Sequence, residues 1–559
     1  MHRARVTLLC VTLVLAGACG RGDQSAAASG EAGGTIVIAS TSDADALLLP
    51  ITFSEQGRMV SDLVFDRLAE IGDDMGTIGD RGFTPRLADR CTWSTDSLSV
   101  AFHLNPRARW HDGQPVRASD VRFSIALYKN PKLPPVVAPL ITNVDSASVR
   151  DSLTAVVWFH AHRPEAFYDI AYQVQVLPEH VFKDIPPEKL ATSEAARHPV
   201  GSGRFRFVKW EPGTRIELVS DTANYRGRAK LDRVIFSIAP DNEAALTQVL
   251  SGQADVLDLL TPDQVARVMR DTSVRPMRYG ALQYAIMGMN LRDPSHHAAP
   301  HPLFGDVRMR RAISMALDRR AMLRNVFDSV GRLGHGPFPS SLPTADTTLR
   351  VPAYDGAHAA ALLDSLGWRA GADGMRSRNG RPLSFSLIVP TSSKMRMSYA
   401  ILIQDQLKRV GVQVRIDAME GAKFGQQLEG RNFDAMLNSG STDPSPSGAA
   451  QYWGSEGAKP GGSNFVSYVS PAFDALLDSA LAAWDPAVAR RYAVRAYQTV
   501  ADDAPAAWLY DAAGVGAIHR RIRTTHLRPD EWWAHLEDWS IPPAERIDRD
   551  RIGLGSPKP

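Results

Sequence analysis

The chain carries two kinds of hydrophobic pattern, one typical of strands and one typical of helices. Residues 34–39 form a short run of β-formers, and residues 98–104 alternate apolar and polar positions as a half-buried strand does. Residues 58–71 place apolar side chains at helical spacing instead. The same spacing recurs over residues 119–128, where Ser119 is a candidate cap at the start.

Further along, helix ends are marked by their own signals. Asp306 and Asp318 are placed to cap two successive helices. An amphipathic run over residues 400–410 ends at Gly411, and residues 412–416 then alternate as a strand. Helix followed by strand, repeated along 559 residues without internal repeats, predicts α/β lobes and more than one core.

The N-terminus has the pattern of a targeting segment. Residues 1–18 combine a basic start with an apolar run that is too short to span a bilayer, which indicates a signal peptide. Small residues precede Cys19 and resemble a bacterial lipobox, which predicts lipidation of Cys19. An ordinary secretory signal cleaved nearby is the alternative. Residues 19–33 are rich in Gly, Ala and Ser and predict a flexible tether.

Charge gives no support for a nucleic-acid partner. The formal net charge is +2, and loss of residues 1–18 would remove Arg3 and Arg5 and leave a chain close to neutral. A neutral chain without a basic stripe lacks the electrostatic footprint of nucleic-acid binding. Any contact with a membrane is therefore expected through the lipid anchor only.

The three cysteines allow little chemistry. Cys10 would leave with the signal peptide, and Cys19 is assigned to the lipid. Cys91 then stands alone, so no intrachain disulfide can form and no cysteine metal site exists. We expect Cys91 to pack as a small apolar residue.

Enzyme motifs are missing from the sequence. It contains no Gly-x-Ser-x-Gly elbow, no Walker loop and no His-Glu-x-x-His helix. Residues 201–203, Gly-Ser-Gly, are interpreted as a turn. His296, His297 and His301 come nearest to a metal cluster, but they lie among prolines in a predicted loop, so we expect a solvated loop. The predictions are no enzymatic activity, no metal and no cofactor.

Two adjacent segments form a long and specific motif. They are residues 108–116 (ARWHDGQPV) and 118–124 (ASDVRFS). Together they resemble the signature of the family 5 extracellular solute-binding proteins, the oligopeptide and dipeptide receptors of ABC importers. Asp112 and Gly113 suit a turn before a helix start, so the motif marks the fold rather than a ligand site.

Further blocks resemble this family in the same order along the chain. They are residues 199–205 (PVGSGRF), 224–227 (NYRG), 230–236 (KLDRVIF), 250–256 (LSGQADV), 304–312 (FGDVRMRRA), 316–319 (ALDR), 357–368 (AHAAALLDSLGW) and 467–474 (SYVSPAFD). Arg204 replaces the proline of its block. The collinear order covers almost the whole chain after the tether.

The resemblance implies a periplasmic-binding-protein-like α/β fold of the large peptide-receptor class, with two lobes joined by a hinge and an extra subdomain. Residues 34–54, 200–278 and 506–559 would form lobe I. Residues 55–199 would form the extra subdomain, and residues 279–505 lobe II. Trp532 and Trp533 are expected to pack in the core or between the lobes. Closure on a ligand would exclude water and present one shape to a permease.

The same resemblance implies the function. We expect an extracytoplasmic receptor, periplasmic or on the cell surface, which is monomeric and lipid-anchored to a bacterial membrane. It would enclose a peptide or peptide-like ligand and deliver it to an ABC permease. Two alternatives stay open: a ligand-binding scaffold or peptide chaperone without a transporter, and a secreted hydrolase. The ligand class also stays open, because proteins of this fold take nickel chelates, haem, sugars or opines.

One loop is the candidate ligand site. In peptide receptors of this family, an aspartate shortly before an Asp-Pro pair binds the ligand's α-ammonium; here Asp443 and Pro444 match the pair, but small polar residues replace the earlier aspartate. We therefore expect less dependence on a free α-amine at this loop. The predicted ligand-binding residues are Asn438, Ser439, Gly440, Ser441, Thr442, Asp443 and Trp453. The alternative is that the loop merely packs and Trp453 belongs to the core.

Overall fold

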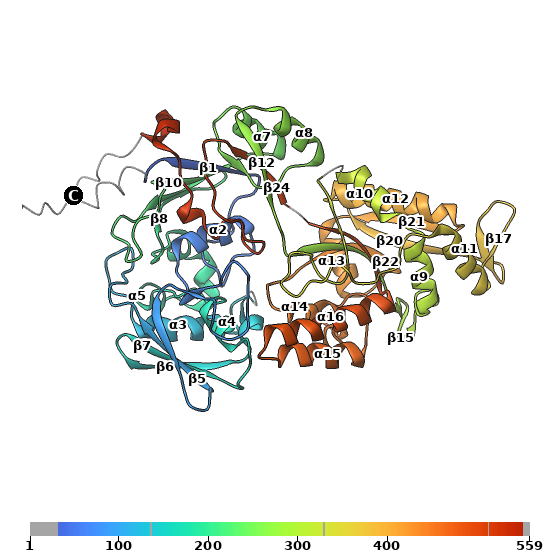
Figure 1. Cartoon of the computed structure of the whole chain (residues 1–559), viewed down its shortest axis with the longest axis horizontal. Helices are drawn as coiled ribbons and strands as arrows, with labels where there is room; N and C mark the ends of the chain where they lie inside the picture. Colours follow the sequence, from blue (N-terminus) through green and yellow to red (C-terminus); the bar gives the residue numbers. More distant parts are fainter. Residues whose placement is uncertain (1–31, 135–136, 328–329, 513, 552–559) are drawn as a thin grey trace, which may run out of the picture.

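The computed structural model describes residues 32–134, 137–327, 330–512 and 514–551. The predicted lipidation site, Cys19, lies outside these residues. Figure 1 shows two groups of helices and strands side by side, with the first half of the chain and its C-terminal part on one side. No helix in the described part of the chain is long and apolar enough to cross a bilayer.

The first group is built on a seven-stranded sheet in the order β12-β24-β11-β1-β10-β9-β8. Its strands are β1 (Thr35–Ser40), β8 (Phe205–Glu211), β9 (Arg215–Ser220), β10 (Arg233–Ile238), β11 (Val256–Leu257), β12 (Val274–Tyr279) and β24 (Gly514–His519). β1 runs parallel to β10 and β11. Ile36 and Ile38 enter one core, whereas Val37 and Ala39 enter another beneath α7 (Asn242–Leu250) and α8 (Pro262–Arg270). Burial on both faces explains the continuous apolar run of β1.

A network of charged side chains ties the C-terminal segment to this sheet. Arg521 is buried and donates to both Asp255, beside β11, and Asp550 near the chain end, at 2.8 and 2.6 Å. The other carboxylate oxygen of Asp550 accepts the backbone N–H of Thr35 at 2.7 Å. The first strand of the sheet is therefore held by residues from the other end of the chain.

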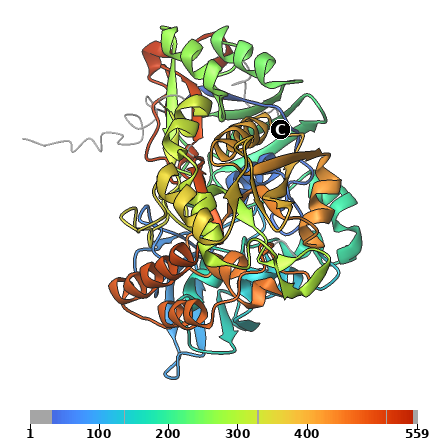
Figure 2. The ribbon, with the colours of Figure 1, turned by 90° about the vertical axis from the view of Figure 1, so that its right-hand side faces the viewer.

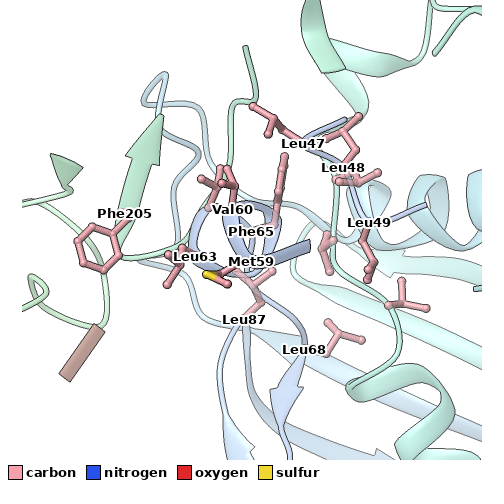
Figure 3. Packing of buried hydrophobic residues seen from close by; sticks show 14 of the residues in the cluster. Leu47, Leu48, Leu49, Met59, Val60, Leu63, Phe65, Leu68, Leu87 and Phe205 are labelled. Carbon is pink, nitrogen blue, oxygen red and sulfur yellow. The ribbon is translucent and has the colours of Figure 1, made fainter. Parts of the chain in front are cut away.

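The extra region around a four-stranded sheet shares a core with the first sheet. Its elements are α2 (Glu55–Val64), β2 (Ala69–Glu70), β3 (Thr84–Pro85), β4 (Ala88–Trp93), β5 (Ser99–Leu104), α3 (Ala118–Tyr128), β6 (Val144–Asp151), β7 (Thr154–Phe159), α4 (Ala166–Ala171), α5 (Glu179–Phe182) and α6 (Glu194–Arg197). The sheet order is β4-β5-β7-β6. Figure 3 shows Leu63, Phe65 and Leu87 packed near Phe205 of β8 in one cluster. Trp532 and Trp533 belong to this core, as predicted.

The second group is built on a six-stranded sheet in the order β16-β23-β13-β22-β20-β21. Its strands are β13 (Gln283–Met289), β16 (Arg332–Leu333), β20 (Ser384–Pro390), β21 (Gln413–Met419), β22 (Ala435–Ser441) and β23 (Ala506–Asp511). Small strands lie outside it: β14 (Arg292–Asp293), β15 (His296–Pro300), β17 (Arg369–Ala370), β18 (Arg376–Arg378) and β19 (Arg381–Pro382).

Helices cover both faces of this second sheet. The core on one face takes side chains from α9 (Val307–Met315), α10 (Arg319–Phe327), α11 (Gly356–Ser365) and α12 (Lys394–Arg409). The core on the other face takes side chains from α13 (Gly421–Glu429), α14 (Gly448–Trp453), α15 (Pro471–Leu481) and α16 (Pro486–Asp503). Figures 1 and 2 place α15 and α16 beside the region that holds α4. There the rings of His162 and Trp484 lie 4.3 Å apart.

Two short segments join the sheets. Residues 280–282 separate β12 from β13, and residues 512–513 separate β23 from β24. β12 and β24 are antiparallel neighbours in the first sheet, and β13 and β23 are antiparallel neighbours in the second. Both crossings therefore connect two neighbouring strands of the first sheet to two neighbouring strands of the second, as a hinge requires.

The strand pairing places the last boundary between the two sheets later in the chain than residue 506. We expected residues 506–559 in the first lobe, but β23 pairs with β13 and β16 in the second sheet. Residues 506–511 and 514–518 are buried, so the sequence alone does not show where the chain passes between sheets. The other boundary, expected after residue 278, lies one residue before the end of β12 at Tyr279. The extents of the two lobes as separate bodies stay a prediction.

The predicted helices and strands are present, but several of their bounds differ; α12, for example, begins at Lys394, ahead of the run predicted from residue 400. The predicted caps are confirmed: Asp306 accepts the N–H of Arg308, and Asp318 that of Ala321, both at 2.9 Å. α3 begins one residue earlier than expected, and the carboxylate of Asp120, not Ser119, accepts the N–H of the residue before the helix. α2 ends at Val64 rather than near residue 71, because the next residue is extended and the chain turns into β2.

The histidine segment is a hairpin strand rather than a loop. His296 and His297 lie exposed in β15, whereas His301 is buried and its Nε2 lies 3.2 Å from a carboxylate oxygen of Asp434. Over the residues described, no group of three His, Cys, Asp or Glu side chains could hold a metal ion.

Candidate ligand site between the lobes

The predicted loop begins at the edge of the second sheet that faces the crossing segments. Asn438, Ser439, Gly440 and Ser441 are the last four residues of β22. Ser441 pairs with Gln283, the first residue of β13 after the crossing. β20 and β21 run parallel to β22, so the carboxyl ends of all three strands lie on the same side of the sheet. Ligands of open α/β sheets bind outside the carboxyl ends of such strands.

Four of the seven predicted residues line one small pocket. They are Asn438, Ser439, Gly440 and Trp453, together with Tyr284, Ile286, Met436, Tyr452, Ser463, Phe465 and Val466. Trp453 is only 1% exposed, and its indole N–H donates to the hydroxyl of Tyr284 at 2.9 Å. Its ring packs edge-on against Trp508 with centroids 5.1 Å apart. Trp453 is thus part of the core beneath the pocket, and its contact with ligand stays a prediction.

The hydroxyl groups after the pocket make contacts within the protein. The Ser441 hydroxyl accepts a hydrogen bond from Gln283 Nε2 at 3.1 Å, and the Thr442 hydroxyl donates to the Asp443 carbonyl at 3.3 Å. Both side chains remain partly exposed. A ligand can bind these hydroxyl groups only by replacing the hydrogen bonds that they make within the protein.

Asp443 lies away from the pocket, against the region that holds α4. Gln173 Nε2 donates to Asp443 at 3.4 Å, and Ser445, two residues further on, donates to Glu165 at 2.7 Å. Burial, reinforced by the charge of Glu165, raises the pKa of Asp443 to about 7. Burial and Glu165 also raise the pKa of Asp169 well above its usual range. Three carboxyl groups therefore meet where α4 touches the second lobe, and their repulsion opposes this contact when they are ionised.

Arg396 is a candidate that the sequence did not reveal. It lies in the first turn of α12 and donates to the Ser439 hydroxyl. Within the described ranges, no carboxylate forms an ion pair with it, and burial lowers its pKa. A guanidinium beside the predicted loop without an internal counter-ion suits a carboxylate of the ligand. Because Arg396 and Ser439 are 43 residues apart, their proximity could not be inferred from spacing.

Two α/β lobes joined by two crossing segments, with polar strand ends at the shared edge, define a solute-binding protein. The chain belongs to the bacterial extracellular solute-binding proteins, family 5, whose model matches residues 82–461, more than half of the chain. This confirms the predicted family and fold. Members are extracytoplasmic ligand receptors of ABC transporters and not enzymes, so the chain is a solute-binding receptor.

Relatives share the fold and differ in ligand. The chain is 25% identical over 454 residues to the oligopeptide-binding protein AppA of Bacillus subtilis, covering 79% of this chain and 80% of AppA. The structure of AppA from Bacillus subtilis with a nonapeptide matches with a TM-score of 0.74 at 22% identity, over 91% of this chain and 99% of that one. NikZ from Campylobacter jejuni, in complex with Ni(L-His), matches with a TM-score of 0.74 at 21% identity, over 90% and 99% of the two chains.

Proposed function

We propose that the protein is the lipid-anchored receptor of an ABC importer, which encloses a peptide or peptide-like ligand between its lobes and delivers it to the permease. The observation that carries this proposal is that the two crossing segments join the sheets at the strand ends that face each other. The carboxyl ends of β1 and β11 in the first sheet and of β22 in the second all lie on the side of the crossing segments. A ligand held there contacts both lobes and stabilises the closed form.

The ligand class is supported by the charges beside these strand ends. Arg396 offers a guanidinium to a carboxylate, and Ser439 and Asn438 offer neutral donors and acceptors beside it. A peptide carries both kinds of group. The AppA relative that binds a nonapeptide supports the same class.

Native mass spectrometry of the protein purified from its own cells tests the ligand class. We expect retained peptides, because a closed receptor releases its ligand slowly. Retention of a sugar, haem or metal chelate in place of peptides would overturn the peptide assignment and leave the receptor role intact.

A ligand identified in this way should close the protein. Small-angle scattering is expected to show a smaller radius of gyration when the ligand is added to protein freed of it, because the lobes approach about the two crossing segments. At a ligand concentration of 100 times Kd, binding should also stabilise the fold by about 2.7 kcal/mol, visible as a higher Tm. An unchanged radius in the presence of bound ligand would contradict the hinge mechanism.

Attachment to the membrane is expected to depend on Cys19. Cys19→Ala should move the protein from the membrane fraction to the soluble fraction, because acyl chains would be its only anchor. Cys91→Ala is the matched control, since Cys91 lies within the folded part of the chain and should leave fractionation unchanged. If processed Cys19→Ala protein stayed with the membrane, the lipid anchor would be wrong.

A further inference from the structure

A second polar pocket lies on the first lobe, at the strand ends beside the crossing segments. It is lined by Ser40, Thr41, Ser42, Glu55, Gln56, Met59, Asn242, Asp258 and Leu259. Ser40 ends β1, and Asp258 follows β11 directly. The Tyr279 hydroxyl donates to the Asp258 carbonyl at 3.0 Å, and Tyr279 is the last residue of β12 before the crossing. The pocket therefore lies beside the hinge, where a ligand between the lobes would reach it.

Two carboxylates in this pocket have no internal counter-ion. Glu55, the first residue of α2, and Asp258 form no ion pair with any Lys, Arg or His of the described residues, and Arg58 is the positive charge that acts on Glu55 from a distance. Burial, together with the charge of Asp258, raises the pKa of Glu55 to about 7. Burial likewise raises the pKa of Asp258. Glu55 remains exposed at the pocket mouth and Asp258 is half-buried, and a bound cation would lower the repulsion between the two carboxylates.

A third group in the pocket independently points to a ligand. Gln56 is 3% exposed, and its Nε2 has no hydrogen-bond partner. A buried amide N–H without an acceptor costs about 1–3 kcal/mol, which a ligand oxygen would recover. Leu259 lines the same pocket and is 56% exposed, so an apolar surface lies next to these polar groups.

We propose that this pocket binds the amino-terminal residue of the ligand. The Glu55 and Asp258 carboxylates bind its α-ammonium, Gln56 Nε2 donates to its carbonyl oxygen, and Leu259 packs against its side chain. In a peptide the ammonium and the carbonyl are attached to the same α-carbon, so one residue offers the cation and the acceptor together. Arg396 on the second lobe has the opposite charge and would pair with a ligand carboxylate. This inference rests on the proposed receptor function and names the group that the first lobe recognises.

Native mass spectrometry with two peptide pools tests the assignment. The probes are an equimolar mixture of three- to nine-residue peptides with free amino termini and the same mixture after N-acetylation. Wild-type protein freed of ligand is expected to bind free peptides at least ten times more tightly than acetylated ones. Glu55→Gln/Asp258→Asn should reduce this preference to less than threefold while retaining acetylated peptides. The single variants Glu55→Gln and Asp258→Asn should each give an intermediate preference.

The matched control is Asp405→Asn/Glu456→Gln, which removes two exposed carboxylates of the second lobe. It should keep the wild-type preference. If the preference were unchanged in Glu55→Gln/Asp258→Asn, the subsite would be wrong and the receptor function would stand. If wild-type protein bound acetylated peptides as tightly as free ones, the subsite would again be wrong. Binding of neither pool by wild-type protein would overturn the peptide ligand and the subsite together.

Discussion

Replacing Arg528 by methionine should lower the free energy of unfolding by about 3–5 kcal/mol. The Arg528 side chain is 0% exposed. Its guanidinium donates to the Ile71 carbonyl at 2.9 Å and to Asp530 at 2.7 Å, and it lies 2.8 Å from Glu70. Methionine fills a similar volume but leaves the buried Asp530 without a cation and Glu70 with Arg67 alone, 3.9 Å away. Urea unfolding, followed by circular dichroism, measures the loss.

The matched control for this substitution is Arg409→Met. Arg409 pairs with Asp405 on the exposed face of α12, and its side chain is 70% exposed. Exposed pairs of this kind contribute less than about 1 kcal/mol. Equal stability of Arg528→Met and wild-type protein would mean that the buried carboxyl groups take up protons and do not need the guanidinium.

Trp453→Ala should destabilise the second lobe by about 3–5 kcal/mol, because it leaves a cavity in the core. The Tyr284 hydroxyl would also lose its donor, and the edge-on contact with Trp508 would disappear. Circular dichroism during urea unfolding measures the change. Trp484→Ala is the control of the same chemistry; Trp484 is exposed, so its loss should cost less than about 1 kcal/mol.

Trp453→Phe separates packing from ligand contact. Phenylalanine keeps one ring in the core but removes the indole N–H and part of the ring volume, so we expect a loss smaller than that of Trp453→Ala, of which about 1–3 kcal/mol comes from the unpaired Tyr284 hydroxyl. A Trp453→Ala protein of wild-type stability that had lost ligand affinity would contradict the core assignment and support the predicted ligand wall.

Much of the fold could be predicted from the sequence because its signals are local. The motif over residues 108–124 and the collinear blocks after it indicate the family, and the family implies the two lobes. Caps such as Asp306 act within one helical turn, so their side chains can be assigned from spacing alone. The end of α2 could not, because the apolar residues after Val64 keep helical spacing although the chain is extended there.

The candidate site was harder to predict from the sequence because its residues are far apart along the chain. Asn438, Ser439 and Gly440 were found since they form one segment, whereas Arg396 comes from another helix. Glu55 and Asp258 are about two hundred residues apart and share a pocket only because β1 and β11 run parallel and end together. No periodic pattern in the sequence predicts that these two residues lie close together. Trp453 fits a core or a pocket equally well by composition, and only its burial distinguishes them.

The position of β1 sets the order in which the lobes can fold. β1 lies between β10 and β11, and residues near position 550 hold its first N–H. The second sheet, by contrast, uses one continuous stretch from β13 to β23. During synthesis the first sheet is completed last, because β24 and Asp550 follow the second lobe, and β1 itself has no partner until β10 is made about two hundred residues later. Until then its apolar TIVIAS segment remains an unpaired strand, the kind of segment through which incomplete chains aggregate.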